Sequence, residues 1–163
     1  MISFLSRNYN NYLYYNLVTT YVNASFASNN KTFQHDDIHL WLSDTTNLFN
    51  IMRSIHNANG VDNFKINKIE REVPFYSGSN YLQGICDGVV DYEWYNKDYR
   101  LIIEIKPTLG SISGIIGQVK VYRNHFEYSK PKVVIVTYDQ NNKYDKLLKQ
   151  EGIDVYRIAK TVA

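Results

Sequence analysis

The sequence predicts an α/β protein in which a mixed central β-sheet is flanked by helices. One observation is the strand-like alternation of apolar and polar residues over residues 64–107. A second is that segments before and after this stretch carry apolar residues three and four positions apart, as on one face of a helix. A third is the short β-branched run "KVVIVTYD", which is typical of a buried strand. The expected order is helix, three-strand meander, helix, strand, helix, strand.

The first predicted helix follows a segment whose structure the pattern leaves open. Residues 1–35 are rich in Tyr and Asn, and "YLYYNLVTTYV" fits a strand as well as one face of a helix. From Asp36 onward we expect one long amphipathic helix, with Asp36 or Asp37 as its N-cap and Asn59-Gly60 as its end. Its inner face would consist of Ile38, Trp41, Leu42, Thr45, Leu48, Phe49, Met52 and Ile55.

Three strands in a meander come next. The first is "FKINKIEREVPFY", and "YLQGICDGVVDYEWYNKDYRLIIEIKP" over residues 81–107 alternates as a β-hairpin. A turn centred on Asn96-Lys97 would place Asp87 opposite Lys106, residue 89 opposite Glu104 and residue 91 opposite residue 102. A slip of one residue or a bulge would change which face these side chains share.

The C-terminal part alternates between helices and strands. A serine cap followed by apolar residues at helical spacing predicts a helix from Ser111 to Glu127. The buried strand "KVVIVTYD" follows, then a short helix in "NNKYDKLLKQEG" that Gly152 ends, and the last strand "IDVYRIA". No repeat, linker or low-complexity segment divides the chain, so we expect residues 1–163 to form a single domain.

The charge of the chain is unevenly distributed. The formal net charge is +2. Residues 1–96 hold six Lys and Arg against nine Asp and Glu, a net charge of −3, whereas residues 97–163 hold twelve against seven, a net charge of +5. A modest basic bias permits a polyanionic partner, although solvated lysines are the commoner reason for such a surplus.

Cysteine usage and hydropathy point to a reducing compartment. Cys86 is the only cysteine, so the chain has no internal disulfide and cannot hold an iron–sulfur cluster on four cysteines. No segment has the features of a signal peptide or the length of a membrane span, so we expect a cytoplasmic protein without a membrane partner. The many Asn, Tyr, Ile and Lys residues have A/T-rich codons, which hints at a virus, a mobile element or an A/T-rich microbe; for a virus the compartment is the host cytoplasm.

Charged residues interrupt the apolar strand "LIIEIKP". Glu104 and Lys106 share one face about 6.6 Å apart, and the expected register brings Asp87 beside them. An exposed salt bridge is the usual reason for such a pattern. Here, however, the neighbouring strand residues are apolar on both faces, and two carboxylates in apolar surroundings repel each other unless a lysine or a cation neutralises them. Carboxylate oxygens are the ligands that Mg²⁺ prefers, so the pattern suits a hard-metal site. These apolar neighbours are Leu101, Ile102, Ile103 and Ile105.

The same residues resemble the PD-(D/E)xK nuclease superfamily, in particular its RecB-like branch. Asp87 followed by Glu104-Ile105-Lys106 matches the central motif of that superfamily. The resemblance covers residues 66–159. Three further motifs match in order: "EVPF" at Glu72 to Phe75, "GICD" at Gly84 to Asp87, and Gln118-x-x-x-Tyr122 in the predicted helix after the lysine.

The resemblance implies a restriction-endonuclease-like fold and assigns roles at the site. Asp87, Glu104 and the carbonyl of Ile105 would bind Mg²⁺ or Mn²⁺, and Lys106 would position the attacking water. Gln118 would reach toward this water or the nucleic acid, with Tyr122 one turn along the helix; the simpler alternative for both is the polar edge of an amphipathic helix. Upstream histidines often complete such sites, and the candidates here are His35 and His39. Glu72 would assist the metal or pair with a lysine.

The resemblance implies DNA as the substrate and hydrolysis of its phosphodiester bonds as the reaction, by an exonuclease or an endonuclease. We expect DNA to contact the basic C-terminal part. Two alternatives stay open: a nucleic-acid-binding protein of the same fold that does not cleave, and a dimeric Holliday-junction resolvase, against which the Q-x-x-x-Y motif argues. A homodimer is compatible with the sequence. The expected DNA contacts around the Gln118 helix are Lys120, Arg123, Lys130 and Lys132.

Overall fold

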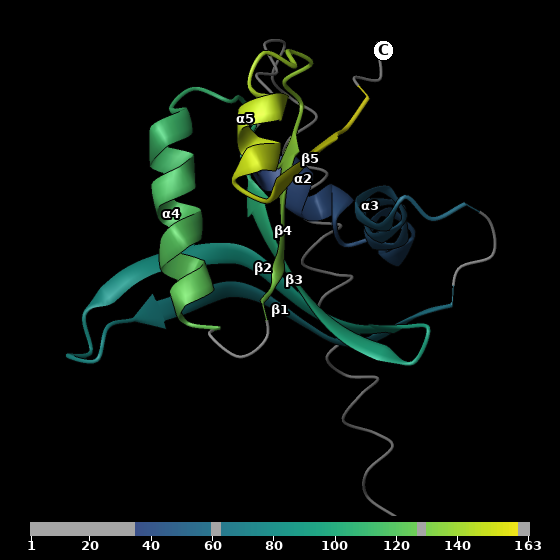
Figure 1. Cartoon of the computed structure of the whole chain (residues 1–163), viewed down its shortest axis with the longest axis horizontal. Helices are drawn as coiled ribbons and strands as arrows, with labels where there is room; N and C mark the ends of the chain where they lie inside the picture. Colours follow the sequence, from purple (N-terminus) through teal and green to yellow (C-terminus); the bar gives the residue numbers. More distant parts are fainter. Residues whose placement is uncertain (1–34, 60–62, 127–129, 160–163) are drawn as a thin grey trace, which may run out of the picture. The chain divides into compact units, whose positions relative to one another are not determined.

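The computed structural model of the chain describes residues 35–159, except 60–62 and 127–129. The segment 1–34, whose conformation the sequence leaves open, and the expected helix end at Glu127 lie outside the described residues. The elements in order (Figure 1) are α2 His35–Trp41, α3 Thr45–His56, β1 Phe64–Tyr76, β2 Leu82–Trp94, β3 Lys97–Ile105, α4 Ile112–Asn124, β4 Lys132–Thr137, α5 Asp145–Gln150 and β5 Ile153–Arg157.

The strands form one mixed sheet, as predicted. Its order is β1-β2-β3-β4-β5. The β1–β2 and β2–β3 pairs are antiparallel, and the β3–β4 and β4–β5 pairs are parallel. Parallel neighbours need a crossover, which α4 and α5 provide. The α/β class and the meander are confirmed, and the arrangement is consistent with a restriction-endonuclease-like core.

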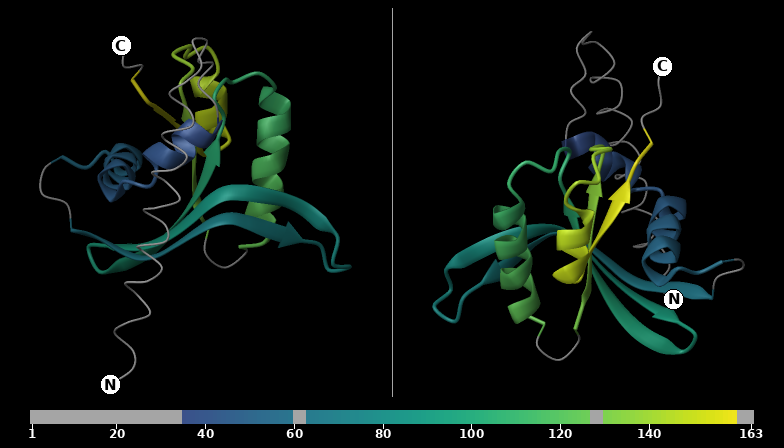
Figure 2. Two further views of the ribbon diagram at one scale, coloured as in Figure 1. Left: turned by 180° about the vertical axis from the view of Figure 1, so that it is seen from behind. Right: turned by 45° about the horizontal axis from the view of Figure 1, so that its top comes forward.

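Helices cover both faces of the sheet. Figures 1 and 2 show α3 on one side and α4 with α5 on the other. Each side buries its own apolar cluster because successive residues of a strand point to opposite faces. On the α3 side the cluster includes Ile38, Ile51, Val90, Leu101, Ile103 and Val134, and on the α4 side it includes Phe75, Val89, Ile102, Val119, Val133 and Ile135.

The prediction of one long helix after Asp36 is wrong, because the chain forms α2 and α3 with a break between them. Asp44 caps α3, and its side chain accepts a hydrogen bond from the N–H of Thr46 at 2.8 Å. Helix α3 ends at Asn57, which has a left-handed φ of 49°, rather than at Asn59-Gly60. Apolar spacing continues across the break because both helices pack into the same core cluster.

The predicted hairpin register is shifted by two residues. Strands β2 and β3 are joined at Tyr95-Asn96, whose φ values of 48° and 59° are those of a tight hairpin turn. Val89 therefore lies opposite Ile102 rather than Glu104. A shift of two residues keeps every side chain on the same face of the sheet, so Asp87 and Glu104 still share a face as predicted.

Among the described residues, no helix combines the length and the apolar character needed to cross a bilayer.

Candidate active site

Asp87 lies where β2 meets helix α2. Its Oδ1 atom is 2.9 Å from Nε2 of His35 and 3.6 Å from Nε2 of His39. The two histidines are four residues apart, so both rings reach the same carboxylate from one face of the helix. The other oxygen, Oδ2, accepts a hydrogen bond from the backbone N–H of Ile105 at 2.5 Å. Asp87 thus joins α2 to the end of β3.

The surroundings of Asp87 favour its ionised form. Burial alone would raise the pKa of this carboxyl, but His39, the N–H of Ile105 and the charge of His35 together lower the pKa below its usual value. These contacts favour the carboxylate form of Asp87, and each of its oxygens faces a different group.

Glu104 is the most deeply buried charged group that the structure describes, with 2% of its surface exposed. Its Oε1 atom accepts a hydrogen bond from Nζ of Lys106 at 2.6 Å. Its Oε2 atom is buried and has no hydrogen-bond partner among the described residues. Burial and the neighbouring charge of Asp87 raise the pKa of Glu104 to about 7, against the opposing effect of Lys106. A buried carboxylate oxygen without a partner is costly unless a cation or a proton satisfies it.

Lys106 is held by backbone contacts from β4. Its N–H donates to the carbonyl of Val136 at 3.0 Å. Just beyond it, the hydroxyl of Thr137 donates to the carbonyl of Pro107 at 3.3 Å, and the N–H of Leu109 donates to Asp139 Oδ2 at 3.0 Å. Thr137 and Asp139 therefore fix the turn that follows the lysine. Sequence analysis missed both residues, because only the parallel β3–β4 pairing brings them there.

The Q-x-x-x-Y pair, Gln118 and Tyr122, belongs to α4. Gln118 donates a hydrogen bond to the hydroxyl of Tyr122, which in turn donates to the carbonyl of Ile85 at 2.8 Å. Tyr122 is fully buried. A Cβ atom at Gly84 would lie 3.2 Å from Tyr122 Cε1, so the glycine of "GICD" leaves the space that this ring fills. The two motifs therefore pack against each other, and through them α4 contacts the strand that carries Asp87.

The residues present fit a divalent metal ion. Ligand atoms of His35, His39 and Asp87 all lie within 4.8 Å of one another. Glu104 is not a member of this group, but the charge of Asp87 raises the pKa of Glu104, and its Oε2 atom has no hydrogen-bond partner among the described residues. Ile105, whose carbonyl the resemblance implies as a ligand, is tied directly to Asp87 through its own N–H. Two imidazole nitrogens and nearby carboxylate oxygens are a normal donor set for a divalent ion.

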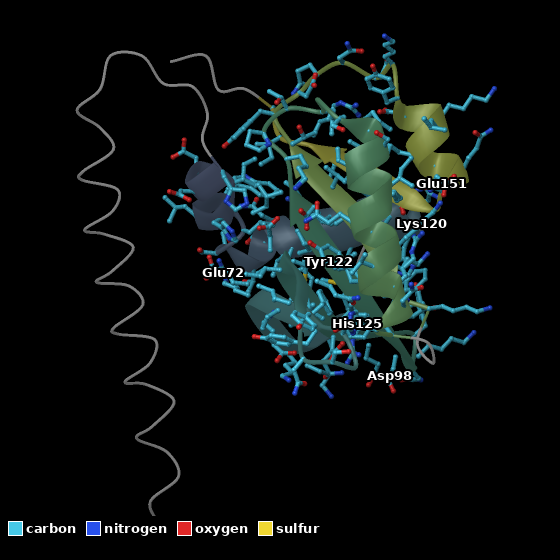
Figure 3. All side chains as sticks on the ribbon, turned by 90° about the vertical axis from the view of Figure 1, so that its left-hand side faces the viewer. Glu72, Asp98, Lys120, Tyr122, His125 and Glu151 are labelled. Atoms are coloured by element: carbon cyan, nitrogen blue, oxygen red, sulfur yellow. The ribbon has the colours of Figure 1, made fainter. Side chains whose placement is uncertain are left out.

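Glu72 stays outside this group. The pairs Arg71–Gly88 and Val73–Cys86 place Glu72 across from Asp87 in the β1–β2 ladder. Its side chain is nevertheless exposed, and its φ of 48° is left-handed, which marks an irregularity in this edge strand. In Figure 3 Glu72 lies away from Tyr122.

The expected DNA-contacting residues are not all on one face. Lys120 lies beside Glu151, 3.7 Å from its carboxylate (Figure 3). Arg123 donates to the backbone carbonyls of Glu151 and Gly152 at 2.6 and 2.7 Å, so it caps the end of α5.

Lys130 and Lys132 differ from each other in their surroundings. Lys130 is exposed just before β4. Lys132 alternates with Val134 and Val136, which pack on the α3 side of the sheet. Burial and the charge of Lys132 lower the pKa of His56, at the end of α3, to about 4. The structure therefore separates Lys132 from Lys120 and Arg123 of α4, contrary to the expected cluster around the Gln118 helix.

Comparisons with known proteins are sparse. No family model matches the chain, and no curated protein matches it. A crystal structure of a repair endonuclease from Pyrococcus abyssi is similar over 71% of this chain and 46% of that chain, with 20% sequence identity and a TM-score of 0.43. The match thus spans less than half of the other protein's length.

Proposed function

We propose that the chain is a divalent-metal-dependent deoxyribonuclease that hydrolyses phosphodiester bonds. The observation that carries the proposal is Glu104, a carboxylate 2% exposed that has one oxygen on Lys106 and the other without a partner, beside the ionised Asp87. A structural salt bridge with Lys106 accounts for the burial of Oε1 of Glu104 but not for the burial of Oε2. A bound cation explains both carboxylates.

Each residue has a separate task in this proposal. Asp87, Glu104, His39 and the Ile105 carbonyl would hold Mg²⁺ or Mn²⁺. A bound ion would lower the pKa of an attacking water and offset the charge that develops on the phosphate. Lys106, whose side chain is 29% exposed, would orient that water through its Nζ atom. Its hydrogen bond to Glu104 keeps Nζ at the site before substrate arrives.

The Q-x-x-x-Y pair supports the RecB-like assignment within the PD-(D/E)xK superfamily. Gln118 is half-buried above Tyr122, so its amide can turn from the tyrosine hydroxyl toward a bound phosphate or water. Tyr122 would act as a positioning residue, because its hydroxyl is buried against Ile85, two residues before Asp87. DNA would lie across α4 and the start of β4, where Lys120 and Lys130 are exposed.

A cleavage assay tests the proposal. The full chain is incubated with linear and circular DNA, single- and double-stranded, and with a four-way junction, in EDTA, Mg²⁺ or Mn²⁺. We expect cleavage with either metal, none in EDTA, and none by Glu104→Gln. Binding of DNA without cleavage under every condition would identify a binding protein of the same fold, and cleavage of junctions alone would identify a resolvase.

A further inference from the structure

Two histidines, rather than one, face the candidate metal site from α2. His35 and His39 direct their Nε2 atoms at the same oxygen of Asp87, at 2.9 and 3.6 Å. Their ring centroids are 4.7 Å apart and nearly edge to face, so the two nitrogens converge without the rings colliding. Nε2 of His39 is buried, and at 3.6 Å from Asp87 Oδ1 it has no hydrogen-bond partner of ordinary length among the described residues.

The donor set decides which ions such a site prefers. Mg²⁺ takes oxygen ligands and keeps several waters, and it gains little from imidazole. Imidazole nitrogen instead favours transition metals, with affinity rising from Mn²⁺ through Co²⁺ toward Zn²⁺ and Cu²⁺. One imidazole among carboxylate and carbonyl oxygen ligands raises the preference for transition metals over Mg²⁺ slightly, and a second imidazole raises it further.

We infer that α2 makes this centre a nitrogen-rich site that binds transition-metal ions such as Mn²⁺, Co²⁺ and Zn²⁺ in preference to Mg²⁺, and that His35 sets the preference. This inference concerns the site of the proposed function, and it rests on that function for the role of the ion in catalysis. The binding itself requires no cleavage.

His35 is placed to act as a ligand. Its Nε2 atom is within hydrogen-bond distance of Asp87 Oδ1, and its Nδ1 atom lies 3.9 Å from the carboxylate of Asp36. When an ion replaces the hydrogen bond between Nε2 and Asp87, the ring proton would be on Nδ1, on the side of Asp36. The side chain of His35 is 43% exposed, so the ring can adjust when an ion takes the place of the hydrogen bond.

Cobalt provides a probe of the site, because its visible absorption bands report the ligands around the ion. Co²⁺ is titrated into the full chain, and Mg²⁺ binding is measured separately from the rise in melting temperature. The variants are His35→Gln, His39→Gln and His35→Asp. The matched control is His125→Gln, since His125 is an exposed histidine that contacts Gln83 and not α2.

We expect the wild type to bind Co²⁺ at least tenfold more tightly than Mg²⁺. His35→Gln should weaken Co²⁺ binding by at least tenfold, because loss of even an outer partner of a ligand costs about 10- to 100-fold. Mg²⁺ binding should change by less than about twofold, since Mg²⁺ gains little from imidazole. His35→Asp, which replaces nitrogen with oxygen, should shift the preference toward Mg²⁺. The control should behave as the wild type.

Three results would overturn the inference: an unchanged cobalt spectrum and affinity in His35→Gln, an equal loss of Co²⁺ and Mg²⁺ binding, or no preference in the wild type. Should the variants fail to fold, electron paramagnetic resonance of Cu²⁺ bound to the wild type decides, because the number of nitrogen superhyperfine lines counts the coordinated imidazoles: a two-nitrogen pattern supports the inference, and a pattern of one nitrogen or none overturns it. These readouts are independent of cleavage. Histidine-dependent cobalt binding without any nuclease activity would contradict the proposed function alone, and nuclease activity together with cobalt binding that does not depend on His35 would contradict this inference alone.

Discussion

At the scale of single residues, the site is organised around two carboxyl groups whose pKa values are shifted in opposite directions. Asp87 is held ionised by two histidines and a backbone N–H, whereas burial raises the pKa of Glu104 to about 7. Only one oxygen of Glu104 has a partner, and that partner is Lys106. The charge of Glu104 is therefore incompletely compensated by the protein alone.

Lys106→Met tests whether the lysine acts in catalysis or only neutralises Glu104. In EDTA at pH 8 the variant should lose about 1–3 kcal/mol of stability, because Glu104 is left buried without its partner. Mn²⁺ should restore most of this stability but not cleavage. Melting curves with and without metal, together with the cleavage assay, measure both effects. An equal loss of stability in both conditions, with cleavage retained, would mean a structural ion pair.

Glu104→Gln should remove a pH dependence of stability. The pKa of Glu104 rises from 4.5 to about 7 on folding, so between these values the folded state binds more protons than the unfolded state. Stability from this group is therefore present below pH 4.5 and lost as the pH rises through 7, by at most about 3 kcal/mol. In EDTA the stability of the variant should increase relative to that of the wild type as the pH rises through this range. Denaturant unfolding from pH 4.5 to 8 measures the difference, and a parallel profile for both proteins would contradict the assignment.

At the scale of elements, the contact between α4 and β2 connects two sequence motifs. The ring of Tyr122 fills the space beside Gly84, and its hydroxyl binds the carbonyl of Ile85. Strand β2 reaches Asp87 two residues later. Packing of α4 therefore determines where Asp87 lies, although α4 provides no carboxylate itself.

Gly84→Ala tests this coupling. Its added methyl group would lie 3.2 Å from Tyr122, so the strand or the ring must shift. We expect a loss of about 1–3 kcal/mol of stability and weaker metal binding. Gly78→Ala is the matched control, since no atom lies within 4 Å of its added methyl group. Thermal unfolding with and without Mn²⁺ compares the two, and equal effects would show that the contact is unimportant.

At the scale of the whole molecule, the basic residues divide between two faces of the sheet. Lys120 and Arg123 belong to α4, whereas Lys132 lies on the α3 side with Val134. Arg123 is engaged with the end of α5, and the exposed Lys120–Glu151 pair contributes little stability. Lys120 and Lys130 are therefore the better candidates for DNA contact.

Charge-reversal variants test which of these basic residues contact DNA. Lys120→Glu with Lys130→Glu should weaken DNA binding and reduce the slope of log affinity against log salt by about two, as expected for two lost phosphate contacts. Lys132→Glu serves as the control on the other face and should have a smaller effect. Arg123→Glu should lower the melting temperature instead, because α5 loses its cap. Binding titrations at several salt concentrations measure the slope, and a larger effect of Lys132→Glu would place DNA on the α3 side.

The sequence by itself determined those features that depend on neighbours along the chain. Alternation predicted β1 over the residues that form it, and the serine cap predicted the start of α4 at Ser111. The motif residues Asp87 and Glu104 were found because the two-residue error in the hairpin register preserves the side-chain face. Local periodicity is sufficient for these features, since it reports which side of an element is buried.

Only the tertiary structure decided which distant residues meet. His35 is 52 positions from Asp87 in sequence, and their contact depends on the break after α2 that the continuous apolar spacing concealed. The support of Lys106 by β4, and the placement of Lys132 on the α3 side, follow in the same way from strand pairing. These outcomes arise from how whole elements pack on a sheet, and packing is governed by contacts between residues far apart in sequence.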